Sequence, residues 1–252
     1  MQKSDVCAIG VMAKAPQPGR SKTRLCPPLH IEQAAALSAA FLRDISENIV
    51  AAAREAPIQG LMAYAPAGTV GLFDGHLATG TGFVLADGLI DVPSGVVGFG
   101  RCLLHAIQAM LDAGYGAACV LNSDSPSLPT AFLVRAVQLL MAPGDRVVLG
   151  PAEDGGYYLL GMKAVHARLF ANIAWSSDTV AEATRARAKA LGLDMVELPL
   201  WYDVDDAAAL DRLAAESVAP PPGPHLRYRA PATEAALRRL GRIAEPLSRA
   251  AE

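Results

Sequence analysis

The sequence predicts an α/β protein, a three-layer α/β/α sandwich around a mostly parallel central sheet. Short β-branched or apolar runs alternate along the chain with longer Ala- and Leu-rich segments of helical period. Runs such as Ala118-Cys119-Val120-Leu121 lack apolar–polar alternation, as expected for strands covered on both faces. With 252 residues, 52% hydrophobic and 19% charged, the chain allows one generous domain or one domain with an appendage, and it is too apolar for disorder.

Each element follows from its local pattern. The first strand is expected at residues 6–13 and the first long helix at residues 31–56, where Leu37, Phe41 and Ile45 recur every four residues and form one apolar stripe. Further strands are expected at residues 58–65, 83–86, 117–122, 147–151, 157–161 and 195–198. Helices are expected at residues 100–113, 130–141, 165–171, 178–192 and 206–216.

A proline-rich break divides the chain into a main domain, residues 1–218, and a tail, residues 219–252. The segment APPPGP cannot continue a helix and predicts an extended linker. The tail has six arginines and three acids, whereas residues 1–218 carry 16 basic and 22 acidic residues, so the two parts have opposite sign. A short amphipathic helix around residues 233–248 is favoured for the tail. A subunit contact, and so a homodimer, or an arm for an acidic partner is the alternative.

Composition excludes several classes of function. The formal net charge of -3 provides no overall positive field for nucleic acid or an anionic membrane. No run of 18 apolar residues predicts a membrane span, and the amino-terminal segment does not read as an export signal. The four cysteines form no CxxC pair and the five histidines no metal spacing, so a cytoplasmic protein without zinc or disulfides is expected. No GxSxG elbow is present, which lowers the weight of a hydrolase.

The loop after the first strand is strongly basic. Four cations fall within eleven residues, and no acid occurs between residues 5 and 32. In a parallel sheet this loop leaves the ligand-binding edge, so its cations are expected to face a di- or triphosphate. The loop is neither a Walker A nor a GxGxxG loop, and a solvated basic loop is the alternative. The residues concerned are Lys14, Gly19, Arg20, Lys22 and Arg24.

Aspartates follow two other strands. Asp124 lies at the carboxyl end of a buried strand and could supply the first ligand of Mg²⁺ or Mn²⁺. Asp203 and Asp205 are two residues apart, so in an extended segment they point the same way and could face the same cation. The alternatives are that Asp124 belongs to a turn or caps a helix and that Asp206 caps the helix after it.

The segment GPAEDGGYYLLG at residues 150–161 is a further candidate. Glu153 and Asp154 precede a Gly-Gly turn, and either carboxylate could bind acceptor hydroxyls or act as general base. A plain hairpin turn is the alternative. Trp175 and Tyr157 could stack on a ring, although buried aromatic side chains are commoner than such platforms.

Together these segments resemble the nucleotide-diphospho-sugar transferase superfamily with the GT-A fold. They are most similar to DUF2064, a family described as glycosyltransferases related to the guanylyltransferases of the F420 pathway. Its AKAPxPGxxKTRL motif matches residues 13–25, and its SDxP, GPAEDGGYYLxG, WS and DVD motifs match within residues 122–128, 150–161, 175–176 and 203–205. The resemblance covers about residues 6–215. The usual Gly before Ser-Asp is Asn122 here, and the family's Gln- and Gly-rich segment is replaced by residues 91–100, where Gly100 is the clearest match.

The resemblance implies that Lys14, Arg20, Lys22 and Arg24 grip the nucleotide phosphates and that Asp124 and Asp205 hold the metal. Together with the candidates above, it gives the following predicted roles. Asp124, Asp154 and Lys22 would be catalytic, and Asp124, Asp205 and Asp203 would hold Mg²⁺ or Mn²⁺. Residues that would bind the nucleotide phosphates or the substrate are Lys14, Gly19, Arg20, Lys22, Arg24, Glu153, Gly155, Gly156, Tyr157 and Trp175.

Two reactions fit such a site. Attack on an anomeric carbon releases a nucleoside diphosphate and defines a glycosyltransferase, whereas attack on an α-phosphorus releases pyrophosphate and defines a nucleotidyltransferase of the guanylyltransferase kind. Four cations favour a triphosphate, while the EDGGYY loop and the family's description favour sugar transfer. The sequence therefore predicts a metal-dependent transferase, with glycosyl transfer from a nucleotide sugar to a small acceptor favoured over nucleotidyl transfer from a nucleoside triphosphate. A non-catalytic nucleotide-binding protein is the third alternative.

Overall fold

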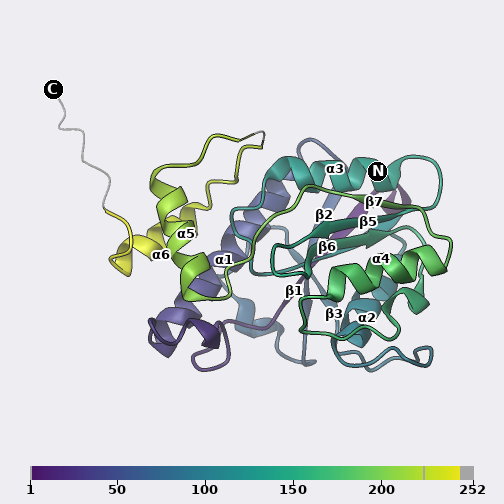
Figure 1. The fold of residues 1–252 in the computed structure, drawn as a ribbon, viewed down its shortest axis with the longest axis horizontal. Coiled ribbons are helices and arrows are strands. Elements are labelled where there is room, and N and C mark those ends of the chain that lie inside the picture. The colour runs from purple at the N-terminus through teal and green to yellow at the C-terminus, as the bar shows by residue number, and fades with distance from the viewer. Residues whose placement is uncertain (1, 224, 245–252) are drawn as a thin grey trace.

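The computed structural model describes residues 2–223 and 225–244. Within them, seven strands form one sheet in the order β3-β2-β1-β4-β6-β5-β7 (Figure 1). All seven predicted strands are present, and each lies within one residue of its predicted bounds. They are β1 (Cys7–Ala13), β2 (Ile58–Tyr64), β3 (Gly82–Leu85), β4 (Ala117–Leu121), β5 (Val147–Pro151), β6 (Tyr157–Met162) and β7 (Met195–Glu197).

Neighbouring strands are parallel except at β6. β1 pairs in parallel with β2 and β4, β2 with β3, and β5 with β7. β6 is antiparallel to both β4 and β5, because the five residues 152–156 that join it to β5 are too few for the crossover that a parallel neighbour needs. The mostly parallel sheet is confirmed, and residues 152–156 also form the hairpin turn that was the alternative for this segment.

Hydrophobic cores lie on both faces of the sheet. Along β1, Cys7, Ile9 and Val11 face the core shared with α1 (Ile31–Ala52) and α3 (Thr130–Met141), whereas Ala8 faces the core under α2 (Phe99–Asp112) and α4 (Val180–Ala190). Successive residues of a strand point to opposite faces, so an unbroken apolar run serves both cores. The predicted three-layer sandwich is confirmed (Figure 1).

The helices follow the prediction with one exception. Residues 165–171 do not form an α-helix: Leu169 N–H donates to the His166 carbonyl three residues back, and Ala171 then bridges to Val96 in extended conformation. That region is the 3₁₀ helix η4 (Ala167–Phe170), and the others are η1 (Lys3–Asp5), η2 (Thr23–Leu25) and η3 (Val70–Phe73). No helix in the described part of the chain is long and apolar enough to cross a bilayer.

The tail returns to the main domain. After α5 (Ala207–Val218), helix α6 (Pro231–Arg239) packs on α1, and Leu237 is buried in the same core as the α1 stripe. The buried carboxylate of Asp44 on α1 accepts hydrogen bonds from the N–H groups of Ala232 (2.9 Å) and Thr233 (2.6 Å). The predicted tail helix at 233–248 thus begins two residues early and ends at Arg239, while residues 245–248 of that range lie outside the described residues.

Candidate active site

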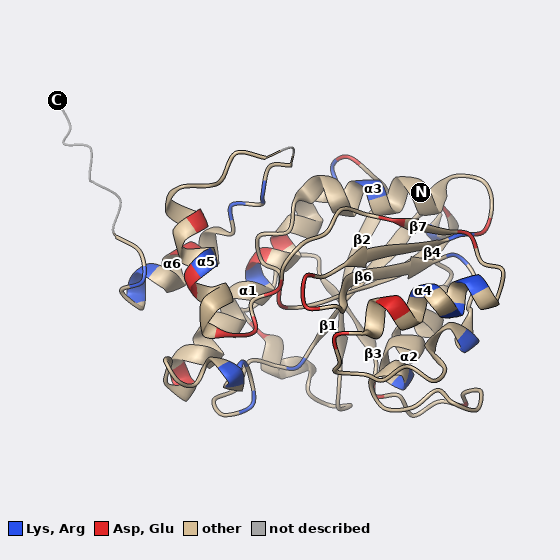
Figure 2. Ribbon diagram, in the orientation of Figure 1, with Lys and Arg blue, Asp and Glu red and all other residues tan. Residues whose placement is uncertain are grey.

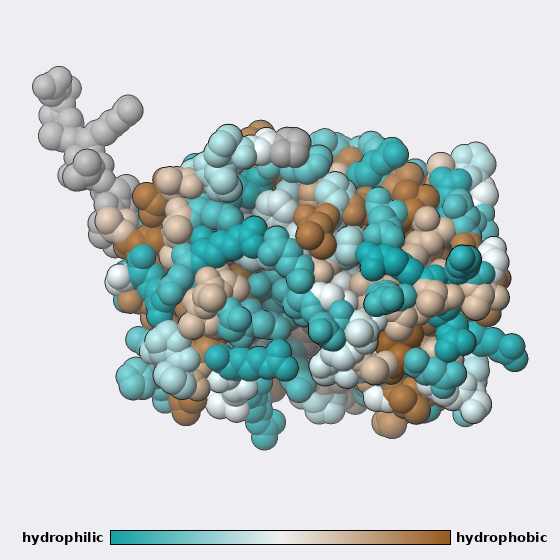
Figure 3. All heavy atoms as spheres, viewed as in Figure 1, coloured by the Kyte–Doolittle hydropathy of each residue, from teal (hydrophilic) through white to brown (hydrophobic). Residues whose placement is uncertain are grey.

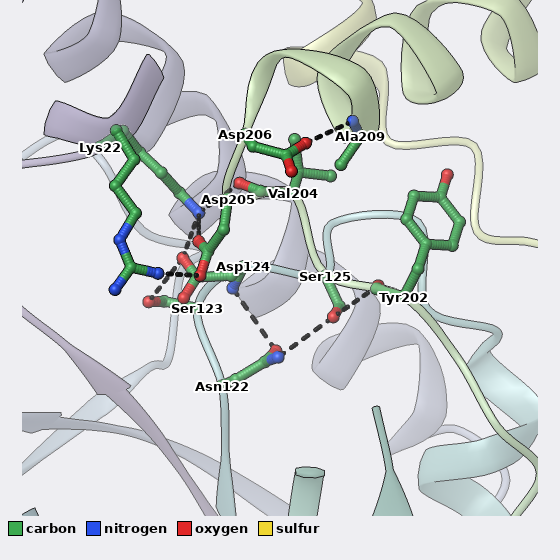
Figure 4. Close-up of polar contacts among 11 residues, drawn as sticks. Lys22, Asn122, Ser123, Asp124, Ser125, Tyr202, Val204, Asp205, Asp206 and Ala209 are labelled. Carbon is green, nitrogen blue, oxygen red and sulfur yellow. Dashed lines mark hydrogen bonds and ion pairs between the residues drawn. The ribbon is translucent and has the colours of Figure 1, made fainter. Parts of the chain in front are cut away.

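Three segments that follow parallel strands meet at one edge of the sheet. They are the loop after β1, the loop after β4 and the segment between β7 and α5 (residues 14–25, 122–129 and 198–206). The Val204 N–H donates to the Asp124 carbonyl at 2.8 Å, and the Ser125 hydroxyl donates to the Tyr202 carbonyl at 2.9 Å (Figure 4). Carboxyl ends of parallel strands are where open α/β sheets bind ligands, so this edge is the candidate site.

The Lys22 ammonium lies between two carboxylates. Its Nζ is 2.5 Å from Asp124 Oδ1 and 3.0 Å from Asp205 Oδ1, and it donates to the Val204 carbonyl at 2.7 Å (Figure 4). Burial lowers the pKa of Lys22, but the charges of Asp124 and Asp205 and their hydrogen bonds outweigh burial and raise that pKa above its ordinary value. Lys22 is therefore a fixed positive charge where the two carboxylates converge.

The loop after β1 is closed on itself. The Gln17 N–H donates to the Ser21 hydroxyl at 3.1 Å, and that hydroxyl donates to the Ala15 carbonyl at 3.2 Å. Lys22 follows in the left-handed region with φ 51°, which is uncommon for a residue with a side chain. This geometry turns Lys22 into the site, where its side chain is 8% exposed, and leaves Lys14 and Arg20 at the surface.

A pocket of about 380 Å³ opens at this edge and is called the cationic pocket here. The four predicted cations line it, as do Asp124 and Asp205. Small and apolar side chains from β2 and the residue after it, from the residue after β3 and from α2 form another part of its wall. The pocket therefore offers cations for phosphates beside an apolar surface for a flat group. The residues that make up these two parts are Lys14, Arg20, Lys22 and Arg24, and Ala63, Ala65, Ala86, Phe99 and Cys102.

A second pocket of about 530 Å³ adjoins the first and is called the acidic pocket here. Asp154 from the β5–β6 turn and Asp178 from the segment before α4 line it, together with the aromatic rings of Tyr157 and Trp175. Acidic segments gather in the middle of the molecule (Figure 2), where the surface is hollowed and largely hydrophilic (Figure 3). Both pockets share four residues, Arg24, Phe99, Asp124 and Asp205.

Backbone contacts hold the β5–β6 turn beside Asp178. Gly155 has φ +87°, and a Cβ placed on it would lie 1.9 Å from the Asp178 carbonyl oxygen, so only glycine fits. The Ala181 N–H in the first turn of α4 donates to the Gly155 carbonyl at 2.9 Å, and the Gly156 N–H donates to Asp154 Oδ1 at 2.8 Å. The turn and the start of α4 thus form one wall of the acidic pocket.

Asp203 is crowded by other acids. Burial raises its pKa first, and the charges of Asp154, Asp205 and Asp124 raise it further, to about 7. Asp154 has the largest effect of the three carboxylates. Asp203 is therefore close to both the metal-binding candidates and the turn, although it lines neither pocket.

The carboxylates of Asp124 and Asp205 fit a divalent cation whose other ligands come from the substrate and water. Among the residues that the structure describes, no group of three or more His, Cys, Asp and Glu side chains is placed to hold a metal. Mg²⁺ in proteins is commonly bound by one or two carboxylates, with phosphate oxygens and water completing the shell. Asp124 and Asp205, which converge on one cationic centre, supply such a pair. Asp203 as a third ligand stays a prediction.

The indole ring of Trp175 packs against Gly100. A Cβ on Gly100 would lie 2.6 Å from Trp175 Cζ2, so the indole fits against the first turn of α2 because that position has no side chain. The Phe99 ring meets the indole edge to face at a centroid distance of 6.0 Å. The Tyr157 hydroxyl is buried and has no hydrogen-bond partner among the described residues. Burial raises the pKa of Tyr157 above its ordinary value.

Other predicted residues lie apart from the pockets. Glu153 points to α5, where its Oε2 is 2.7 Å from Arg212 Nη1, and it lines neither pocket. Asp206 caps α5 by accepting a hydrogen bond from the Ala209 N–H at 2.8 Å, which was the alternative for that residue (Figure 4). Gly19 is exposed with φ +72° and also lines neither pocket.

Several pocket residues were missed by sequence reasoning. Ala63, Ala65, Ala86 and Cys102 carry no chemical signal, because small apolar residues at strand ends and on a helix read as core. Asp178 was assigned only to the start of a helix. Its position two residues after the Trp-Ser segment, which was itself singled out, is the signal that could have found it.

The fold and this pair of pockets define an α/β protein with a candidate ligand site at the carboxyl edge of its sheet, and comparisons give its family. The chain belongs to the family described as "Uncharacterized protein conserved in bacteria (DUF2064)", which matches residues 49–177. The predicted family is therefore confirmed. A comparison with curated proteins finds no match.

Solved structures share the fold. A provisionally assigned nucleotide-diphospho-sugar transferase from Desulfovibrio desulfuricans G20 superposes with a TM-score of 0.79 at 26% identity, covering 96% of each chain. CMP:2-keto-3-deoxy-manno-octonic acid synthetase in complex with CTP superposes with a TM-score of 0.50 at 13% identity, covering 84% of this chain and 98% of the other, and shows the fold alone. The predicted nucleotide-diphospho-sugar transferase fold is confirmed.

Proposed function

We propose that this chain is a metal-dependent glycosyltransferase that moves a sugar from a nucleotide-diphospho-sugar to a hydroxyl group of a small acceptor. The observation that carries the proposal is the junction of a cationic and an acidic pocket at Asp124, Asp205 and Arg24. A donor sugar on a diphosphate needs cations on one side and an acceptor site on the other. The name of the Desulfovibrio desulfuricans G20 relative supports the same class.

The cationic pocket would bind the donor. Lys14 and Arg20 are exposed and Arg24 is 75% exposed, so these three side chains can reach a diphosphate without first being desolvated. The wall that carries Ala63, Ala65 and Ala86 leaves room for a base, since none of these side chains extends beyond a methyl group. Donor binding is thereby assigned to the carboxyl ends of β1, β2 and β3.

The acidic pocket would bind the acceptor. A new C–O bond would form between the acceptor oxygen and the anomeric carbon while the bond from that carbon to the diphosphate breaks, and Asp154 is the base to which the hydroxyl proton passes. The Gly156 N–H bond to Asp154 Oδ1 fixes the orientation of this carboxylate. A divalent cation held by Asp124 and Asp205 would supply neutralisation of charge on the leaving diphosphate. The protein's share of catalysis is then alignment and electrostatics.

Nucleotidyl transfer is the second candidate. Four cations in one pocket suit a triphosphate, and a protein of similar fold binds CTP. The two reactions differ in their products, because a nucleotidyltransferase releases pyrophosphate and a glycosyltransferase releases a nucleoside diphosphate. The acidic character of the acceptor side favours glycosyl transfer, because many nucleotidyl acceptors attack through a phosphate.

A binding and product assay tests the proposal. Thermal shifts of the full chain would be measured with UDP-, GDP-, ADP- and CDP-sugars and with the four nucleoside triphosphates, each with and without Mg²⁺ or Mn²⁺. We expect a metal-dependent shift with one sugar nucleotide, followed by release of its nucleoside diphosphate. Asp124→Asn and Asp205→Asn should abolish the metal dependence. Asp206→Asn is the matched control, because asparagine also caps helices and Asp206 points away from the site.

The outcomes separate the candidates. A shift with one triphosphate alone and release of pyrophosphate would establish nucleotidyl transfer instead. Binding of a nucleotide without turnover of any donor would establish the non-catalytic alternative. Full metal-dependent turnover by both Asp→Asn variants would refute the metal assignment.

A further inference from the structure

We propose that the acceptor held by the acidic pocket is a polyhydroxyl compound without an anionic group, such as a sugar or a polyol. This inference rests on the proposed function and deepens it by naming the acceptor class. It is carried by the charge balance of a pocket of about 530 Å³, a size within the range of about 300–1,000 Å³ that is typical of small-ligand sites.

The charges of the pocket oppose an anion. Four carboxylates and one guanidinium, that of Arg24, line it. Asp124, Asp205 and Arg24 are shared with the cationic pocket, so a bound cation and the donor diphosphate would engage them. What remains for the acceptor is Asp154 and Asp178. A phosphate or carboxylate there would face two like charges with no lysine or arginine of its own.

The structure places the Asp154 carboxylate and the Asp178 backbone. Asp154 is oriented by the Gly156 N–H through Oδ1, which leaves its second oxygen for a ligand. The backbone of Asp178 contacts Gly155 directly. In the described residues neither carboxylate forms an ion pair with a lysine, arginine or histidine. Ionised carboxylates only accept hydrogen bonds, so their natural partners are hydroxyl groups that donate.

The rest of the wall suits a carbohydrate. Trp175 is half-buried against Gly100, so its ring is a rigid surface for the C–H groups of a sugar or polyol. Tyr157 also lines the pocket, although its hydroxyl is buried. Ser176 and Ser177 add neutral hydroxyls to the same pocket. Carboxylates, hydroxyls and an aromatic ring together match a neutral polyhydroxyl ligand.

The test uses acceptors matched in skeleton and differing in charge. With the nucleotide sugar that gives the metal-dependent shift, release of nucleoside diphosphate above the donor-only rate would be measured for glycerol, glycerol 3-phosphate and glycerate. The same comparison would use ribose, ribose 5-phosphate and ribonate, and then glucose, glucose 6-phosphate and gluconate. We expect the most active acceptor to be uncharged, with kcat/KM at least tenfold above its phosphorylated and carboxylated counterparts.

A charge variant adds a second readout. Asp178→Asn should raise the KM for the uncharged acceptor about tenfold. It should also reduce the ratio of kcat/KM for the uncharged acceptor to kcat/KM for the phosphorylated one. The thermal shift caused by the donor should stay unchanged. Glu182→Gln is the matched control, because Glu182 is exposed in the first turn of α4 and lines neither pocket. It should leave both acceptor constants unchanged.

The results distinguish failure of the acceptor class from failure of the proposed function. An anionic acceptor as the most active member, or no stimulation by any of the nine compounds although the donor binds, would overturn the acceptor class and leave the proposed donor site intact. An unchanged acceptor preference in Asp178→Asn would equally refute the role of the acidic wall. Failure of every sugar nucleotide to bind would refute the proposed function itself, and the inference with it.

Discussion

At the scale of single residues, Lys22 decides the electrostatics of the site. Two carboxylates lie within 3.0 Å of its ammonium, and the main chain binds it as well. A divalent cation bound by Asp124 and Asp205 would compete with this ammonium for the same oxygens. Lys22 therefore stabilises the two carboxylates when no metal is bound. By the same contacts it would lower the affinity of the site for a metal.

Replacing Lys22 tests this competition. Lys22→Met leaves Asp124 and Asp205 without their cation, so we expect a loss of about 1–3 kcal/mol in the free energy of unfolding. Added Mg²⁺ should then stabilise the variant more than it stabilises the wild type, because no ammonium competes. Denaturant unfolding with and without Mg²⁺ measures both effects. Lys14→Met, an exposed position of the same loop, should change stability by less than about 0.5 kcal/mol. Equal stabilisation of Lys22→Met and wild type by Mg²⁺ would contradict the competition.

Two adjacent glycines offer a second test at this scale. A Cβ at Gly155 would collide with the Asp178 carbonyl at 1.9 Å in a left-handed conformation, whereas one at Gly156 would meet Asp154 Oδ1 at 3.1 Å. We expect Gly155→Ala to cost about 2–4 kcal/mol and Gly156→Ala about 1 kcal/mol or less. Urea unfolding of both variants measures the difference. Similar losses would mean that the turn does not rest on Asp178 as the structure has it.

At the scale of elements, buried strands and charged loops could be predicted from the sequence, whereas the apolar walls of the pockets could not. β4 and β5 could be placed from sequence because unbroken apolar runs mark doubly covered strands. The cations and aspartates could be found because charge in loops after such strands is informative. Phe99 and Ala86 could not be recognised as pocket residues, because residues of an apolar pocket wall and of an apolar core show the same sequence pattern. The contact of Lys22 with the Val204 carbonyl could not be predicted either, because it joins residues that are 182 positions apart.

The contact of α6 with α1 gives a prediction of pH dependence. Burial raises the pKa of Asp44, and although the bonds from Thr233 and Ala232 lower it, the net result is above the ordinary value. The native state therefore holds this proton at a pH where the unfolded chain, with a pKa of about 3.9, has lost it. The contribution of Asp44 to stability is full below that value and declines as pH rises through the native pKa.

A neutral variant isolates this effect. Asp44→Asn does not titrate, so the free energy of unfolding of the wild type minus that of the variant should fall as pH rises from about 4 to 7. Urea unfolding at several pH values measures it, and the other titrating groups cancel in the difference. Asp44→Ala, which removes both acceptors, should cost about 1–3 kcal/mol. A difference that grows with pH would show that the hydrogen bonds, not burial, dominate this carboxyl.

At the scale of the whole molecule, the question is whether the tail is a separate part. A proline-rich linker and a reversed charge suggest a division at residue 218, yet α6 shares a core with α1, and Leu237 is fully buried in it. A shared core couples elements thermodynamically, because unfolding one exposes the apolar surface of the other. We therefore expect the main domain and α6 to unfold as one cooperative unit despite the proline-rich linker.

Truncating one side chain of the tail tests this coupling. We expect Leu237→Ala to lower the free energy of unfolding by about 2–5 kcal/mol, as for other buried leucines, and to shift the single transition of the whole chain. Circular dichroism and the fluorescence of Trp175 and Trp201 should follow the same curve, since neither tryptophan lies in the tail. Leu226→Ala, at a position that is 91% exposed, is the matched control and should leave the transition in place. A separate early transition for the tail, with tryptophan fluorescence unaffected, would show that α6 unfolds on its own and that the active site does not depend on it.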